Sequence, residues 1–124
     1  MKIQLIRNDG CHIWETAEKV LKEVLSEAGL PADYEIVVVE DDEKAKEYRF
    51  FGSPQILIDG KDIDPLASKV SDYHFQGCRF YLWPPAERAS GSERKMYEHP
   101  PKAMILQVLQ STQQNKLTER EKVG

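Results

Sequence analysis

Hydrophobic and polar positions follow two different periods over the first forty residues, and together they predict a βαβ unit. Residues 2–7 (KIQLIR) form a short apolar run that predicts a buried strand. Residues 13–28 then carry apolar side chains at helical spacing, which predicts an amphipathic helix that Gly29 and Pro31 end. Residues 34–40 (YEIVVVE) hold a continuous apolar run, as in a strand that is buried on both faces inside a parallel pair.

A second helix and a hairpin follow this unit. The Asp41-Asp42 pair offers a side-chain cap for a short helix over residues 43–51. Residues 55–58 predict a strand, and the Asp59-Gly60 dipeptide after it is a strong hairpin signal. Residues 61–63 then begin the returning strand. The predicted order of elements up to this point is therefore β-α-β-α-β-β.

The last third of the chain has a weaker pattern. Residues 65–77 are expected to form a loop, and residues 79–83 a strand. Residues 86–99 are expected to form a flexible polar loop, and residues 100–112 a final helix. The final helix is expected because the Pro100-Pro101 pair suits a first helical turn. We therefore expect one domain over residues 1–112 and a polar tail, frayed or disordered, over residues 113–124.

Composition narrows the class of protein. A chain of 124 residues that is 40% hydrophobic is large enough to bury one core. Its net charge of −4, without a basic cluster, argues against nucleic acid and anionic membranes as partners. No apolar run approaches the length of a membrane span, and the start of the chain lacks the apolar core of a signal peptide. Two distant cysteines do not make a secreted disulfide framework, so we expect the reducing cytoplasm.

The candidate chemistry centres on Cys11, which follows an Asn8-Asp9-Gly10 turn and precedes the first helix. A helix N-terminus offers free N–H groups and positive potential, which stabilise a nucleophilic thiolate. A protonated His12 would add to this effect, whereas Asp9 and Glu15 would oppose it. An equally weighted alternative is that Cys11 is a small buried hydrophobe, because free cysteines are often buried. If Cys11 is the nucleophile, we expect it to be partly exposed and more acidic than a free thiol.

Three stretches resemble the thioredoxin/glutaredoxin superfamily. They are Cys11 in DGCHIW, the Gly52-Ser53-Pro54 entry to a glutaredoxin-type hairpin (PQILIDGKDI), and the later segment Gly77-Cys78-Arg79-Phe80-Tyr81. The last is similar to a segment of small bacterial thioredoxin-like proteins. The resemblance covers residues 2–64 and part of 77–110. It implies an α/β, thioredoxin-like fold, a four-stranded mixed sheet with flanking helices (β-α-β-α-β-β-α), and a cis peptide bond between Ser53 and Pro54.

The chain departs from this superfamily in its redox motif. Where those proteins carry C-x-x-C or C-x-x-S, this chain has Cys11-His12-Ile13-Trp14, so the motif contains no second thiol. A resolving thiol would have to come from glutathione, a partner protein or Cys78. Residues 65–77 could lie over the active edge and bring Cys78 close to Cys11. We favour the other arrangement, in which residues 77–83 form the fourth strand and Cys78 points into the core.

Two functional hypotheses follow from the resemblance. In the first, the protein is a thiol–disulfide oxidoreductase with Cys11 as nucleophile and Cys78 as its possible partner, while Ser53, Pro54, His12 and Trp14 bind the substrate. It would need no resident cofactor, and glutathione or a thiol-containing protein would be the co-substrate. In the second, the protein is a non-catalytic module that binds a protein or peptide at the Cys11/Pro54 edge. We expect no metal site, because His12, His74 and His99 lack zinc-type spacing with the cysteines.

Overall fold

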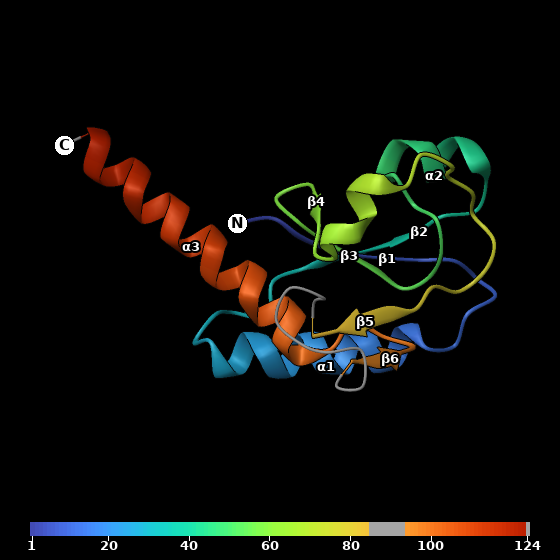
Figure 1. Cartoon of the computed structure of the whole chain (residues 1–124), viewed down its shortest axis with the longest axis horizontal. Helices are drawn as coiled ribbons and strands as arrows, with labels where there is room; N and C mark the ends of the chain where they lie inside the picture. Colours follow the sequence, from blue (N-terminus) through green and yellow to red (C-terminus); the bar gives the residue numbers. More distant parts are fainter. Residues whose placement is uncertain (85–93, 124) are drawn as a thin grey trace.

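The computed structural model describes the backbone of residues 1–84 and 94–123, with side chains as far as Gln114. Within these ranges the chain folds into a mixed α/β structure (Figure 1). In chain order its elements are β1 (Ile3–Arg7), α1 (Trp14–Glu27), β2 (Glu35–Val38), α2 (Asp42–Tyr48), β3 (Gln55–Ile58), β4 (Lys61–Asp62), the 3₁₀ helix η1 (Pro65–Lys69), β5 (Tyr81–Trp83), β6 (Lys95–Tyr97) and α3 (Lys102–Val123). No helix in this part of the chain is long and apolar enough to cross a membrane.

The first four strands form one mixed sheet in the order β2-β1-β3-β4. Strand β1 runs parallel to β2, with Leu5 opposite Ile36, and antiparallel to β3, with Leu5 opposite Ile56. Strand β4 continues the hairpin from β3 at the edge of the sheet. The predicted four-stranded mixed sheet with flanking helices is therefore confirmed at this level.

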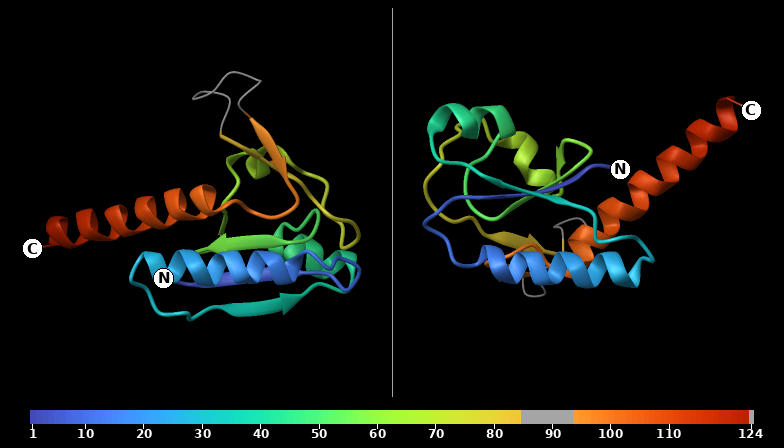
Figure 2. Two further views of the ribbon diagram at one scale, coloured as in Figure 1. Left: turned by 90° about the horizontal axis from the view of Figure 1, so that it is seen from below. Right: turned by 180° about the vertical axis from the view of Figure 1, so that it is seen from behind.

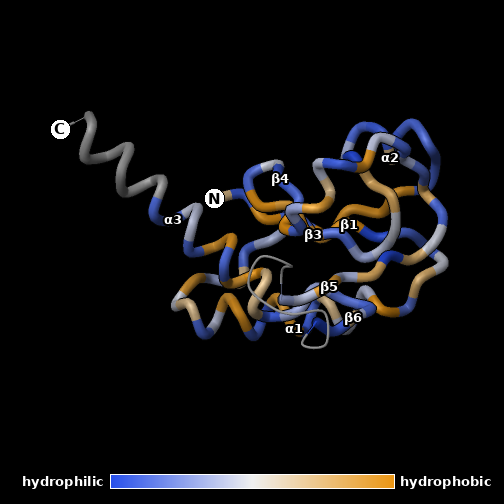
Figure 3. The backbone as a smooth tube through the Cα atoms, in the orientation of Figure 1, coloured by the Kyte–Doolittle hydropathy of each residue, from blue (hydrophilic) through white to orange (hydrophobic). Residues whose placement is uncertain are grey.

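The sheet separates two hydrophobic layers, because side chains alternate between its faces. Helices α1 and α3 cover one face and α2 covers the other (Figure 2). The first layer joins residues of β1, β3, α1 and α3, which include Leu5, Leu21, Ile56 and Ile105, together with Tyr81 of β5. The second joins Ile6, Val37, Ala45, Phe50 and Leu57. Hydrophobic residues accordingly concentrate along β1 and β3 in Figure 3.

Strand β2 differs from the expectation that it is buried on both faces. It lies at the edge of the sheet with β1 as its neighbour, and 41% of Ile36 is exposed. An apolar run alone cannot distinguish an edge strand from a central one. Helix α2 has the predicted Asp41 cap, whose carboxylate accepts the Lys44 N–H, but it ends at Arg49 in a left-handed cap rather than at Gly52.

The last third of the chain contains the main corrections to the predicted fold. The fourth strand of the sheet is β4; the predicted strand over 79–83 appears as β5, which pairs with β6 in a separate hairpin. Strand β6 lies inside the predicted flexible loop 86–99, most of which falls outside the described residues. Helix α3 starts against α1 and projects away from the sheet as far as Val123 (Figure 1), so the expected end of helix near Thr112 is wrong.

Candidate functional site

Cys11 lies in the loop between β1 and α1 and is almost fully buried, with 3% of its surface exposed. Because Ile13 is the N-cap of α1, Cys11 sits before the helix and not in its first turn. Its N–H donates to Asn8 Oδ1 at 3.1 Å, and its Sγ donates to the Ser53 carbonyl at 3.6 Å. The expected partial exposure of Cys11 is therefore wrong, because the loop and the chain around Ser53 close over it.

Cys78 is exposed, and its Sγ lies 2.9 Å from the Sγ of Cys11. The favoured expectation, that Cys78 points into the core as part of the fourth strand, is contradicted. The chain after η1 instead passes over the end of the sheet and places the two sulfurs in contact. The hydrogen bond to Cys11, partial burial and the negative charges of Cys11 and Glu98 raise the pKa of Cys78 to about 11.

Pro54 introduces β3 through a cis peptide bond with Ser53, as the resemblance implied. Both residues are buried. The Ser53 N–H donates to the Gly77 carbonyl, and the Ser53 carbonyl accepts the Arg79 N–H, each at 3.1 Å. Ser53 thus pairs with Cys78 as in a parallel ladder. Ser53 is a predicted substrate-binding residue, and its backbone N–H and carbonyl are paired with residues 77 and 79 of the protein's own chain.

The side chain of Asn8 joins the two cysteine-bearing segments. It is 4% exposed; its Oδ1 accepts the Cys11 N–H, and its Nδ2 donates to the carbonyls of Phe75 at 2.9 Å and Gly77 at 2.8 Å. In the sequence, Asn8 is visible only as a turn residue. Its position directly after a buried strand and three residues before a cysteine is the signal that would have marked it as part of the site.

Gly52 allows the Cys78 segment to approach the loop before β3. Its φ of +150° is strained for residues with a side chain. A Cβ at this position would lie 2.9 Å from Arg79 Cβ and 3.1 Å from the Cys78 carbonyl carbon. The two backbones therefore pack together at a distance that a side chain would prevent.

Arg79 anchors the segment on the other side of Cys78. Its guanidinium, 4% exposed, makes two hydrogen bonds to the Asp62 carboxylate at 2.8 and 2.9 Å, and it lies 3.9 Å from Asp64. The same group stacks over the rings of Phe51 and Tyr81. Burial is the main cause that raises the pKa of the Asp64 carboxyl above its usual value. The chain is thus fixed on both sides of Cys78: the hydrogen bonds of Asn8 hold the residues before it, and the buried ion pair of Arg79 holds the residue after it.

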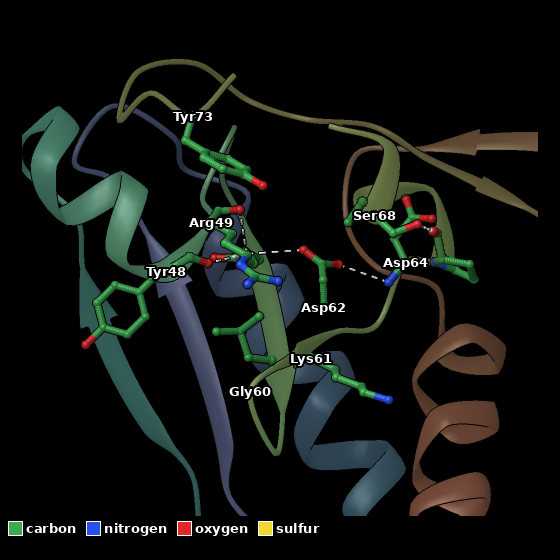
Figure 4. Close-up of a pocket in the computed structure, with 12 residues that line it drawn as sticks. Tyr48, Arg49, Gly60, Lys61, Asp62, Asp64, Ser68 and Tyr73 are labelled. Atoms are coloured by element: carbon green, nitrogen blue, oxygen red, sulfur yellow. Dashed lines mark hydrogen bonds between the residues drawn. The ribbon is translucent and has the colours of Figure 1, made fainter. Parts of the chain in front are cut away.

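Two clefts flank this arrangement. One, of about 420 Å³, is lined by residues of α2, β3, β4 and η1 and by residues near them, among them Asp62 of β4 and the non-helical Arg49, Asp64 and Tyr73 (Figure 4). In it, Asp62 also accepts a hydrogen bond from Gln55 Nε2 at 3.2 Å. The other cleft, of about 470 Å³, lies between residues 8–10, 39–40 and 75–77. The first of these segments directly precedes Cys11, and the last directly precedes Cys78.

The remaining predicted site residues lie around the loop. His12 is exposed, and Trp14 is half-buried under the guanidinium of Arg7, 4.3 Å from its ring. His74 and His99 each bond a nearby backbone carbonyl, of Gln76 and Pro100. Among the described residues, no group of three or more His, Cys, Asp and Glu side chains is placed to hold a metal ion.

The fold and the site define a mixed α/β domain with two adjacent thiols beside a cis-proline loop. The chain belongs to a family described as a domain of unknown function (DUF2703), whose sequence model matches residues 7–109. The match includes both cysteines, Asn8 and the Ser53-Pro54 pair. Comparison with curated proteins and with solved structures found no match.

Proposed function

We infer that the protein is a thioredoxin-like thiol–disulfide oxidoreductase whose redox pair is Cys11 and Cys78. The observation that carries this proposal is the 2.9 Å distance between the two sulfurs. A disulfide bond is about 2.05 Å long, so a movement of less than about 1 Å would close it. Thiol–disulfide exchange proceeds by attack of a thiolate on a disulfide sulfur, so a second thiol in contact can resolve a mixed disulfide within the same chain.

The fold supports the thioredoxin-like part of the proposal. The four strands β1 to β4 form one mixed sheet, with β1 parallel to β2 and antiparallel to β3, which supports the four-stranded mixed sheet that the resemblance implies. Helices lie on both faces, and the cis Ser53-Pro54 bond enters β3 beside Cys11. The proposed pair differs from the C-x-x-C arrangement because its second thiol comes from a distant segment.

The burial of the two thiols assigns their order of reaction. The exposed Cys78, as thiolate, attacks one sulfur of a substrate disulfide, forms a mixed disulfide and releases the first substrate thiolate. Because the pKa of Cys78 is raised to about 11, only a small fraction of it is thiolate near neutral pH, and this step accelerates as the pH rises. The buried Cys11, as thiolate, then attacks Cys78 Sγ, releases the second substrate thiolate and leaves the Cys11–Cys78 disulfide. Two electrons pass from the protein to the substrate. The two protons that the protein's thiols lose are transferred through water to the two substrate thiolates. A thiol reductant, glutathione or a protein dithiol of the reducing cytoplasm, reverses these steps and restores the protein.

The alternative, a non-catalytic module that binds a peptide at the Cys11/Pro54 edge, has less support. Cys11, Ser53 and Pro54 are all buried, and the Ser53 backbone is already paired with residues 77–79. A peptide would have to displace this segment before it reached the edge.

The test is to equilibrate the reduced protein with buffers of defined reduced-to-oxidised glutathione ratio. Remaining thiols are then alkylated and peptides mapped by mass spectrometry. We expect a Cys11–Cys78 disulfide, with the mass lower by two hydrogen atoms and both thiols protected together. Cys11→Ser and Cys78→Ser are the matched controls, and Cys78→Ser should also lose the reduction of a small disulfide substrate. If both thiols of the wild type are alkylated independently after full equilibration, the oxidoreductase proposal fails and the binding module replaces it.

A further inference from the structure

We propose that Asn8 is a positioning residue that sets the reduction potential of the Cys11–Cys78 pair. This inference rests on the proposed function and extends it. The side-chain hydrogen bonds of Asn8 go to the backbone of the two segments that carry the sulfurs, and it acts through that backbone. The question is whether this one side chain determines how readily the two thiols form a disulfide.

The hydrogen bonds of Asn8 connect both halves of the pair. On one side, its Oδ1 accepts the N–H of Cys11 itself at 3.1 Å. On the other, its Nδ2 donates to the carbonyls of Phe75 and Gly77, and Gly77 directly precedes Cys78. All of these partners are backbone groups, so Asn8 fixes the chain and not a flexible side chain. Its burial removes competition from water.

An amide is the side chain that this position requires. It offers one oxygen acceptor and two N–H donors, which match one backbone N–H and two backbone carbonyls. A carboxylate would keep the acceptor but lose both donors and face two carbonyl oxygens. Ser53 also contacts both segments, chiefly through its backbone, which a substitution cannot remove. Its Oγ additionally accepts the backbone N–H of Asn8 at 3.4 Å, a bond that a substitution of the Asn8 side chain leaves in place. Asn8 is therefore the contact that mutagenesis can test.

Positioning acts on the potential through effective concentration. When the protein holds both thiols together, the chain loses less conformational entropy as the disulfide forms. The disulfide is then more stable and resists reduction by glutathione. If Asn8 is removed, residues 75–78 gain freedom relative to Cys11, and the disulfide becomes easier to reduce. A tenfold change in the exchange equilibrium constant corresponds to about 30 mV for a two-electron couple.

The experiment measures that equilibrium constant in glutathione buffers for the wild type, Asn8→Ala, Asn8→Asp and Asn8→Ser. We expect at least a roughly tenfold loss for Asn8→Ala and Asn8→Asp, which makes the potential about 30 mV less negative. Asn8→Ser retains one donor and one acceptor on a shorter side chain and should shift the constant less, in the same direction. Gln4→Ala is the matched control, because Gln4 is also a buried amide of the β1 region but bonds Glu35, away from the cysteines.

The control separates positioning from stability. Both Asn8→Ala and Gln4→Ala remove a buried hydrogen-bonded amide and should lower the free energy of unfolding, but Gln4→Ala should leave the exchange constant within twofold of the wild type. If the Asn8 variants and Gln4→Ala change the constant equally, the positioning role is overturned while the oxidoreductase proposal stands. If Asn8→Ala does not fold, an unchanged constant in Asn8→Ser overturns it. Absence of any disulfide in the wild type would instead refute the proposed function.

Discussion

Removing the charge of Asp62 should destabilise the protein strongly, because it leaves the Arg79 guanidinium buried without its main partner. Arg79 is 4% exposed at its side chain and bonds both Asp62 oxygens. Breaking a buried ion pair by removing one partner costs about 3–5 kcal/mol. In Asp62→Asn one carbonyl oxygen remains as acceptor, and the Asp64 carboxylate lies 3.9 Å from the Arg79 guanidinium. We therefore expect a loss of free energy of unfolding at the low end of this range, about 3 kcal/mol.

The assay is urea unfolding followed by far-ultraviolet circular dichroism. With a slope of about 1–3 kcal/mol per molar urea, a loss of about 3 kcal/mol lowers the midpoint by about 1–3 M. Asp33→Asn, at an exposed carboxylate, is the control and should change stability by less than about 0.5 kcal/mol.

A second variant tests the physical reason for the loss. Asp62→Asn combined with Arg79→Met also removes the guanidinium and should recover part of the lost stability, because no buried cation is left without its partner. The substituted amide keeps an oxygen that can accept from Gln55 Nε2 or from the Asp64 N–H. If Asp62→Asn loses less than about 1 kcal/mol, or if the double variant is less stable than Asp62→Asn alone, the argument that Arg79 is desolvated and dependent on Asp62 is refuted.

Three further predictions concern the site and its surroundings. In the reduced protein, alkylation of Cys78 by iodoacetamide should keep accelerating up to a pH of about 11, and a plateau well below that pH would contradict this. Cys11→Ala should move the titration toward the ordinary thiol range, because the largest cause, the hydrogen bond to Cys11, is gone. Gly52→Ala should cost about 1–3 kcal/mol in urea unfolding and slow disulfide formation, because its Cβ would meet Arg79; equal rates would disprove the close packing. Because the pKa of Asp64 is raised in the folded protein, protonation of this carboxyl stabilises the fold at a pH below its pKa in the unfolded chain, and the contribution is lost as the pH rises through its folded pKa. The free energy of unfolding of Asp64→Asn, relative to that of the wild type, should therefore be higher at about pH 7 than at about pH 4, and urea unfolding at both pH values measures this.

The hydrophobic pattern predicted the first half of the fold because its elements are local. The helical spacing over residues 13–28 and the apolar run of 55–58 led to α1 and β3 within one residue. The Asp59-Gly60 turn fixed the hairpin, and Gly52-Ser53-Pro54 led to the cis bond. In each case, neighbouring residues in the sequence determine the geometry.

The site was harder to predict because its geometry depends on contacts between distant segments. Burial of Cys11 and exposure of Cys78 both result from the path of the chain after η1, for which residues 65–77 carry no periodic signal. Asn8 has the composition of a turn residue, and its partners lie 67 and 69 positions away. The partner of Arg79, Asp62, likewise becomes evident only when the chain is folded.

The 67 positions between Cys11 and Cys78 would give a disulfide between them a different meaning from that of a C-x-x-C disulfide. A crosslink that closes a loop of this length removes chain entropy from the unfolded protein worth about 4 kcal/mol, against about 2 kcal/mol for a loop of four residues. A short loop closes readily in an unfolded chain, whereas two cysteines 67 positions apart meet less often there and are held in contact by the folded structure. Oxidation would therefore record that the chain has reached its native topology, and reduction would return the protein to a state that unfolds more readily.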